Sequence, residues 1–178
     1  MRGAIVAALL GAASGAQAQK AFFEDFEGLT LGPNREEGVA GLNVWTKSAP
    51  VGWTADDTGM PGLGTATDGV IEWAGWSFAN KDWWVRTAGD QRRSDFSFGQ
   101  GTVMIADPDE WDDAAHTKGL FNSFLSTPEI TLSGYAANSL VLPFDSCWRP
   151  EGRDDGGASF PTLEDGTPIN DQTGLVLV

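Results

Sequence analysis

Glycine and proline divide this sequence into short apolar runs, and that division restricts the folds open to the chain more than any other feature. The 178 residues include 23 glycines and 9 prolines, the two residues that most destabilise the interior of a helix. The runs between them are rich in β-branched and aromatic residues and are bounded by turn-forming residues, as strands are. This pattern excludes a helical bundle and predicts an all-β fold.

A series of short strands separated by turns is typical of an antiparallel β-sandwich, and we expect one of the jelly-roll type with at most one short helix. The segment 78–87 contains neither glycine nor proline, and it predicts that helix. The strands are expected at 21–26, 42–46, 51–54, 70–73, 102–106, 120–126, 129–132, 140–144 and 173–178.

Residues 1–18 have the three parts of a secretory signal peptide. Arg2 supplies a positive charge, an apolar run follows, and small residues stand at Ala16 and Ala18, where a signal peptidase requires them. The apolar run is shorter than the ~20 residues of a membrane-spanning helix. We therefore expect a secreted or periplasmic domain at 19–178, with no membrane span after the signal is removed.

The chain is strongly acidic, with 25 Asp and Glu against 11 Lys and Arg and a net charge of −14. Such a surface repels phosphate backbones, so nucleic acid is excluded as a partner. The single histidine, His116, and the single cysteine, Cys147, cannot form a histidine-rich zinc site or an internal disulfide. Cys147 is expected to be a buried, small apolar residue.

Four short motifs resemble those of a known module. They are Phe-Phe-Glu-Asp-Phe-Glu-Gly at 22–28, Phe-Leu-Ser-Thr-Pro-Glu-Ile at 124–130, Leu-Val-Leu-Pro-Phe-Asp-Ser at 140–146 and Gly-Leu-Val-Leu-Val at 174–178. Together they resemble the MAM-like, concanavalin-like jelly-roll modules of secreted bacterial proteins, including those attached to secreted hydrolases such as calcineurin-type phosphoesterases. The metal motifs of those phosphoesterases do not occur in the sequence, and we predict no catalytic residue.

The resemblance implies a calcium ion and further strands. In such modules an acidic residue of the opening strand commonly helps to hold a structural calcium ion, and Glu27 matches that position. The modules also continue with several more strands, whereas the run 173–178 reaches the end of the sequence without a closing turn. We therefore expect an incomplete domain, the N-terminal part of a longer protein; alternatively, this run closes the sheet.

An acidic run at 107–113 offers a second calcium site. It holds five carboxylates in seven positions, and calcium accepts oxygen ligands in a flexible geometry. Because alternate residues of an extended chain point the same way, Asp107 and Asp109 are the expected ligands. The competing interpretation is a solvated acidic turn.

Tryptophans gather in one stretch, since four of the eight lie at positions 73, 76, 83 and 84. Exposed indole faces stack on sugar rings, and neighbouring cations add hydrogen bonds. Trp83, Trp84 and Arg86 are therefore the expected ligand-binding residues. Core packing is the competing explanation, and an extended chain would turn only one of the adjacent Trp83 and Trp84 inward.

These features predict a secreted, non-catalytic accessory or binding module, stabilised by calcium, whose partner is a polysaccharide or an extracellular protein. Two alternatives remain open. In the first, the chain is the N-terminal part of a secreted hydrolase, with a phosphoesterase as first choice, whose catalytic domain lies outside these residues. In the second, it is a structural domain of the cell surface or of an adhesin.

Overall fold

The computed structural model describes residues 20–87, 89–148 and 174–177, so the predicted signal peptide lies outside the described residues. The described part contains five short strands and four short helices. The strands are β1 (Trp45–Thr46), β2 (Thr54–Asp56), β3 (Ser77–Asn80), β4 (Thr102–Ile105) and β5 (Phe124–Ser126).

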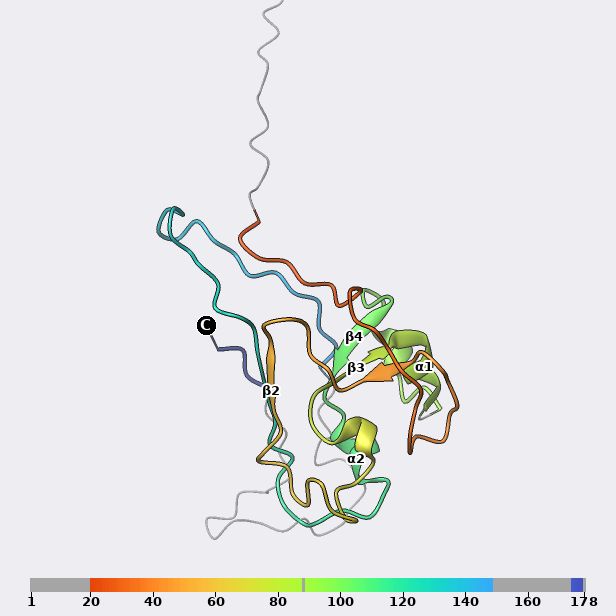
Figure 1. Cartoon of the computed structure of the whole chain (residues 1–178). Coiled ribbons are helices and arrows are strands. Elements are labelled where there is room, and N and C mark those ends of the chain that lie inside the picture. Colours follow the sequence, from red (N-terminus) through yellow and green to blue (C-terminus); the bar gives the residue numbers. More distant parts are fainter. Residues whose placement is uncertain (1–19, 88, 149–173, 178) are drawn as a thin grey trace, which may run out of the picture.

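The strands form two antiparallel sheets, one in the order β1-β3-β4 and one of β2 with β5. In the larger sheet Phe78 stands between Thr46 and Met104 on the neighbouring strands. Figure 1 shows this sheet beside α1, while β2 stands apart from it. The sheets confirm an antiparallel, β-rich fold, and β4 matches the strand predicted at 102–106 almost to the residue.

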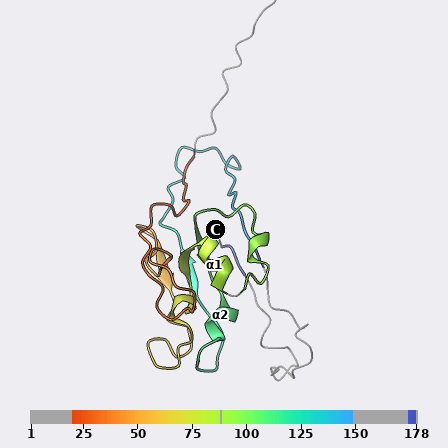
Figure 2. The same ribbon diagram turned by 90° about the vertical axis from the view of Figure 1, so that its right-hand side faces the viewer.

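The expectation of at most one short helix is wrong. The helices are η1 (Ile71–Trp73), α1 (Lys81–Thr87), η2 (Arg93–Asp95) and α2 (Pro108–Asp112). The helix predicted at 78–87 is confirmed as α1, although its first residues belong to β3. Figure 2 shows α1 above α2 on one side of the molecule. None of the helices in the described ranges is long and apolar enough to cross a bilayer.

Local chemistry explains why two predicted non-helical segments are helical. The Asp107 side chain accepts a hydrogen bond from the backbone N–H of Glu110 (3.3 Å), and Pro108 occupies the first turn of α2, where its missing N–H costs nothing. Gly69 and Gly75 flank η1 with φ of +76° and +92°. These left-handed residues turn the backbone away from the extended path that the apolar run 70–73 predicted.

Tryptophans from η1, α1 and α2 form the core. Trp73 and Trp83 have no exposed surface, and their rings stack with centroids 5.7 Å apart. Trp111 of α2 belongs to the same cluster, as do Val103 and Ile105 of β4. Each such ring removes roughly 150–250 Å² from water, so a few of them stabilise a small domain. The core-packing explanation is thereby confirmed for Trp73 and Trp83.

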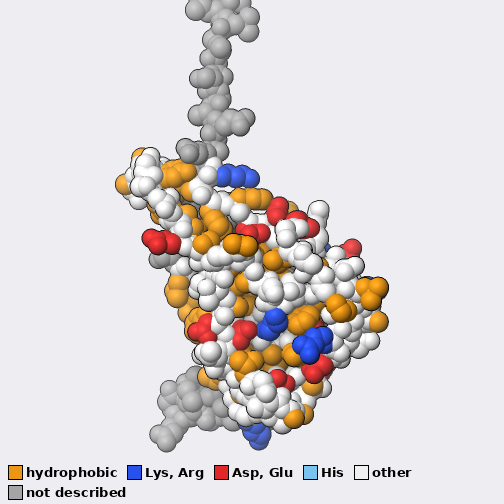
Figure 3. Space-filling view, viewed as in Figure 1, with side chains coloured by type: hydrophobic (Ala, Val, Ile, Leu, Met, Phe, Trp, Pro, Cys, Tyr) orange, Lys and Arg blue, Asp and Glu red, His pale blue; other side chains and the backbone are white. Residues whose placement is uncertain are grey.

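Two apolar segments that were predicted as strands, 129–132 and 140–144, form no strand. Val141 is 85% exposed and Phe144 is 60% exposed, and Figure 3 shows apolar side chains spread over this face among charged ones. An extended segment becomes a strand only beside a hydrogen-bonding neighbour, and none pairs with these segments in the described chain. Cys147, expected to be buried, is partly exposed.

Candidate functional site

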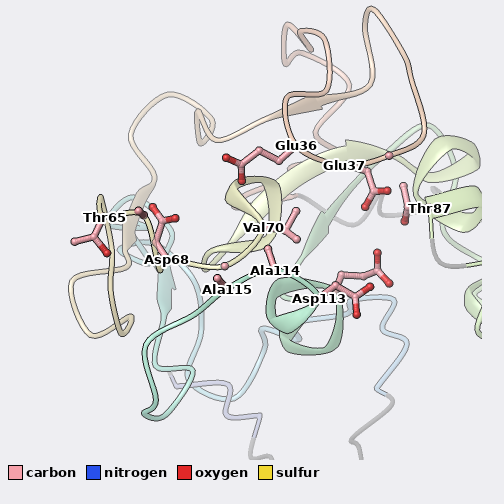
Figure 4. Close-up of a pocket in the computed structure, with 13 residues that line it drawn as sticks. Glu36, Glu37, Thr65, Asp68, Val70, Thr87, Asp113, Ala114 and Ala115 are labelled. Carbon is pink, nitrogen blue, oxygen red and sulfur yellow. The ribbon is translucent and has the colours of Figure 1, made fainter.

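An open pocket of about 540 Å³ lies between the loop before β1, the turn before η1, and α2. Its lining includes the hydroxyls of Thr65 and Thr87. Five carboxyl groups also line it, those of Glu36, Glu37, Asp68, Glu110 and Asp113. Figure 4 shows Glu36 and Glu37 on one side of the pocket and Asp113 across from them. The pocket is thus rich in hydrogen-bond acceptors contributed by segments far apart in the sequence.

A buried carboxylate holds the loop that carries Glu36 and Glu37. Glu72, in η1, has no exposed surface, and its Oε1 accepts hydrogen bonds from the backbone N–H groups of Arg35, Glu36 (2.9 Å) and Glu37 (3.3 Å). The Glu36 side chain in turn accepts a hydrogen bond from the backbone N–H of Ile71 (2.8 Å). These bonds join the loop to η1 and fix one wall of the pocket.

Arg93 joins η2, α1 and α2 beneath the other wall. It is 3% exposed, and its Nη2 lies 2.8 Å from Asp107 Oδ2 and 3.3 Å from Glu110 Oε1. Its Nη1 donates to the carbonyl of Trp84 (2.9 Å) and to the hydroxyl of Thr87 (2.6 Å). A single buried guanidinium therefore balances two carboxyl groups and orients Glu110 towards the pocket.

Glu110 is the titratable group that this environment changes most. Burial is the main cause that raises its pKa to about 7, the negative charges of Asp107 and Glu37 raise it further, and Arg93 opposes them. A hydrogen bond between the Glu37 and Glu110 side chains contributes in the same direction. A carboxyl group with this pKa exchanges its proton near neutral pH, which an ordinary glutamate does not do.

Asp107, predicted as a calcium ligand, makes hydrogen bonds within the protein. Its Oδ2 accepts hydrogen bonds from Arg93 and from the indole Nε1 of Trp84 (3.0 Å), and its Oδ1 caps α2. Asp107 thus pairs with a guanidinium, and its pairing with Asp109 around a cation stays a prediction. The segment is also helical, so the alternation of an extended chain does not apply to it.

Glu27, the other predicted calcium ligand, is separate from these residues. Its Oε1 accepts a hydrogen bond from the backbone N–H of Thr102 (2.8 Å), at the start of β4, whereas Asp107 follows the end of that strand. In residues 20–87, 89–148 and 174–177, no three His, Cys, Asp or Glu residues come together in a way that could hold a metal ion.

The predicted sugar-binding residues lie on α1 and are not brought together on one surface. Trp83 is fully buried, and its Nε1 donates to the carbonyl of Val39 (2.7 Å), so its indole face is not exposed in this structure. Trp84 is half-buried, and the Arg93 guanidinium lies 5.0 Å from the centre of its ring. Arg86 is exposed and donates to the carbonyl of Asp82 (3.2 Å).

Sequence reasoning missed Glu37, Glu72, Arg93 and Glu110. Glu72 contacts residues 35 to 37 positions away, and Arg93 contacts Asp107 14 positions away. No local motif marks such contacts. The one available signal was an acidic residue inside an apolar run, Glu72 before Trp73, because a charge at a core position needs a partner.

Comparison of the chain with known protein families, with curated proteins and with solved structures finds no match.

Proposed function

We propose that this chain is a non-catalytic binding module of an exported protein, built on a jelly-roll-like sandwich, and that it takes its ligand in the acidic pocket. The observation that supports this proposal is the open pocket of about 540 Å³ with its carboxylates and hydroxyls. Pockets with a few convergent polar groups are the usual binding sites of proteins. The pocket sets its acceptors on a rigid frame, because Glu72 and Arg93 hold its walls.

The proposed ligand is a polysaccharide. Carboxylates accept hydrogen bonds from sugar hydroxyls, and bonds to charged acceptors are stronger than those between neutral groups. An extracellular protein that inserts a basic side chain is the second candidate, because five carboxyl groups line the pocket and a cation there would be attracted by all of them.

Affinity electrophoresis of the purified protein in gels with soluble neutral and amino polysaccharides tests this function. The variant Asp113→Asn removes an exposed pocket carboxylate directly after α2. We expect it to weaken binding about tenfold, since a hydrogen bond to a charged group contributes ~1.5–3 kcal/mol. Asp82→Asn, an equal charge change outside the pocket, should bind like the wild type. Equal affinity of wild type and Asp113→Asn would contradict the proposal.

Calcium remains a prediction that the resemblance supports through Glu27. Melting of the protein with calcium and with a chelator tests it, because an ion that binds only the folded state raises the melting temperature. The alternative of a secreted hydrolase is tested by phosphoesterase assays on the longest protein that contains this chain. Export is tested by fractionating cells that express the chain with and without residues 1–18.

A further inference from the structure

The Glu110 carboxyl lies between two partners of opposite character. On one side it meets the Glu37 carboxyl, and on the other its Oε1 is 3.3 Å from Nη2 of Arg93. Asp107 lies 2.8 Å from that same nitrogen. A single guanidinium therefore pairs with two carboxyl groups, and Glu37 adds a third beside Glu110, where Glu110 is only 4% exposed. Carboxylates so close together and away from water repel each other unless one of them carries a proton.

We propose that the Glu110 side chain is a proton-dependent switch in the wall of the acidic pocket. When protonated, Glu110 donates a hydrogen bond to Glu37 and ties the loop 34–41 to α2. When ionised, it gives its proton to water through the open pocket, releases Glu37 and pairs more closely with Arg93. The switch changes which hydrogen-bonding groups Glu37 and Glu110 present to the pocket, and it operates in the protein alone, without a ligand; only its effect on binding rests on the proposed function.

Three segments around Glu110 contribute groups that decide its charge, and η1, which also packs against α2, carries the buried Glu72. The loop before β1 supplies Glu37, η2 supplies Arg93, and the segment before α2 supplies Asp107. Glu36, Asp68 and Asp113 line the same pocket and add negative charge around it. Burial, Asp107 and Glu37 together outweigh Arg93 and bring the pKa of Glu110 to about 7, so the change of state falls near neutral pH.

The surrounding bonds indicate which parts move. The loop backbone is anchored by Glu72 through three N–H groups, and so the loop keeps its place. Glu37 Oε2 also accepts a hydrogen bond from the indole Nε1 of Trp73 (3.2 Å). When Glu110 is ionised, it no longer donates a hydrogen bond to Glu37, and the Glu37 carboxyl changes its position relative to that indole. The Trp73 indole N–H is consequently a reporter inside the protein for the state of Glu110.

Nuclear magnetic resonance of the ¹⁵N-labelled chain tests the switch by following the assigned indole N–H signals from about pH 4.5 to pH 9. We expect the Trp73 signal to shift in one transition with a midpoint near 7. The Trp45 indole donates to the main-chain carbonyl of Glu72 (3.0 Å), and its signal should stay constant. In Glu110→Gln the transition should disappear, because the amide donates to Glu37 at every pH.

Two further variants keep the test decisive. Asp109→Asn removes a neighbouring charge on α2 that does not contact Arg93 or Glu37, and it should keep the wild-type midpoint. In Glu37→Gln the new side-chain amide can donate a hydrogen bond to ionised Glu110. The midpoint of the Trp73 transition should therefore fall by about one pH unit or more. This variant replaces Glu110→Gln if the latter does not fold. The proposal would be overturned if the wild-type Trp73 signal showed no transition above pH 5.5. It would also be overturned if the transition were the same in Glu110→Gln and Glu37→Gln as in the wild type.

Discussion

At the scale of single residues, Glu72 shows how backbone amides can replace a positively charged partner. Its carboxylate has no exposed surface, and Oε1 accepts three backbone N–H bonds from the loop 35–37. Its Oε2 has no hydrogen-bond partner among the described residues. Bonds to an ionised acceptor are about twice as strong as neutral ones. This side chain, together with the bonds that Asn34 makes to Glu37 and Gly41, therefore fixes the conformation of the loop.

Glu72→Gln keeps the size of the side chain and removes its charge. The three amide bonds lose their ionic character, and the new amide group is buried where Oε2 lies without a partner. We expect a loss of about 1–3 kcal/mol in the free energy of unfolding, measured by urea denaturation. Glu129→Gln is the control, since this glutamate is exposed, and it should change stability by less than ~0.5 kcal/mol. A neutral effect of Glu72→Gln would contradict the assigned role.

Glu110 makes stability depend on pH in the direction opposite to most carboxyl groups. Its pKa is raised from 4.5 to about 7 in the folded protein, so the folded state binds the proton more tightly than the unfolded chain does. The resulting stability is fully present below pH 4.5 and is lost as the pH rises to about 7. Urea denaturation between pH 5 and 8 should show this decline, and Glu110→Gln should reduce its slope. An unchanged slope in the variant would refute the assignment.

At the scale of elements, Arg93 connects three helices that share few other polar contacts. It bonds the end of α1 through the Trp84 carbonyl and Thr87, and it pairs with Asp107 at the start of α2. Arg93 itself lies in η2, after four consecutive residues with positive φ, 89–92. The side chains of Arg93 and Asp107 are only 4% and 11% exposed. Each partner therefore depends on the other to offset its loss of hydration.

Asp107→Ala leaves the Arg93 guanidinium buried with only Glu110 beside it and also removes the cap of α2. We expect a loss of about 3–5 kcal/mol, because an uncompensated buried charge costs this much. Thermal unfolding followed by circular dichroism measures it. Asp95→Ala breaks an exposed ion pair, in which the side chains of Arg92 and Asp95 are 72% and 52% exposed. This variant should cost less than ~1 kcal/mol. Equal effects of the two variants would argue against a central role for Arg93.

At the scale of the whole molecule, the Asp57 carboxylate connects the two sheets. It follows β2 and accepts bonds from Lys47 Nζ (3.1 Å), beyond β1, and from the Ser123 hydroxyl (2.5 Å), before β5. The backbone N–H of Trp76, before β3, also donates to it (3.3 Å). Gly75 leaves room for this junction, since a Cβ there would lie 2.0 Å from the Asp57 Oδ1. The Asp57 side chain thus connects the ends of four strands, β1, β2, β3 and β5.

Asp57→Asn replaces an acceptor-only carboxylate with a group that also donates, and it leaves Lys47 without its counter-ion. Burial lowers the pKa of Lys47, while Asp57 opposes this effect. We expect the variant to loosen the β2–β5 sheet, which is exposed along most of its length. Hydrogen exchange of the β5 amides should accelerate about tenfold or more, whereas the β4 amides should change less. Uniform exchange across both sheets would contradict the role of Asp57 as a junction.

Much of the element content could be predicted from the sequence, and the errors have physical reasons. Thr102 to Ile105 form a strand because a run of β-branched and apolar residues follows a glycine turn, which is a local property. The run 70–73 is equally apolar, but it lies between two left-handed glycines and became η1. The acidic run 107–113 looked like a solvated loop, yet its proline and capping aspartate start a helix.

The candidate site could not be predicted from local sequence patterns, because it is made of contacts between segments that are far apart in the sequence. Sequence patterns alone determined that the chain is β-rich and antiparallel and that it carries a helix after β3. Whether its clustered tryptophans bind a ligand or form the core was left open by the sequence, and the structure buries Trp73 and Trp83. Only the tertiary structure decided that Glu37, Arg93 and Glu110 meet in one pocket wall. Local propensity depends on neighbours along the chain, whereas the burial and charge that tune a carboxyl group depend on neighbours in space.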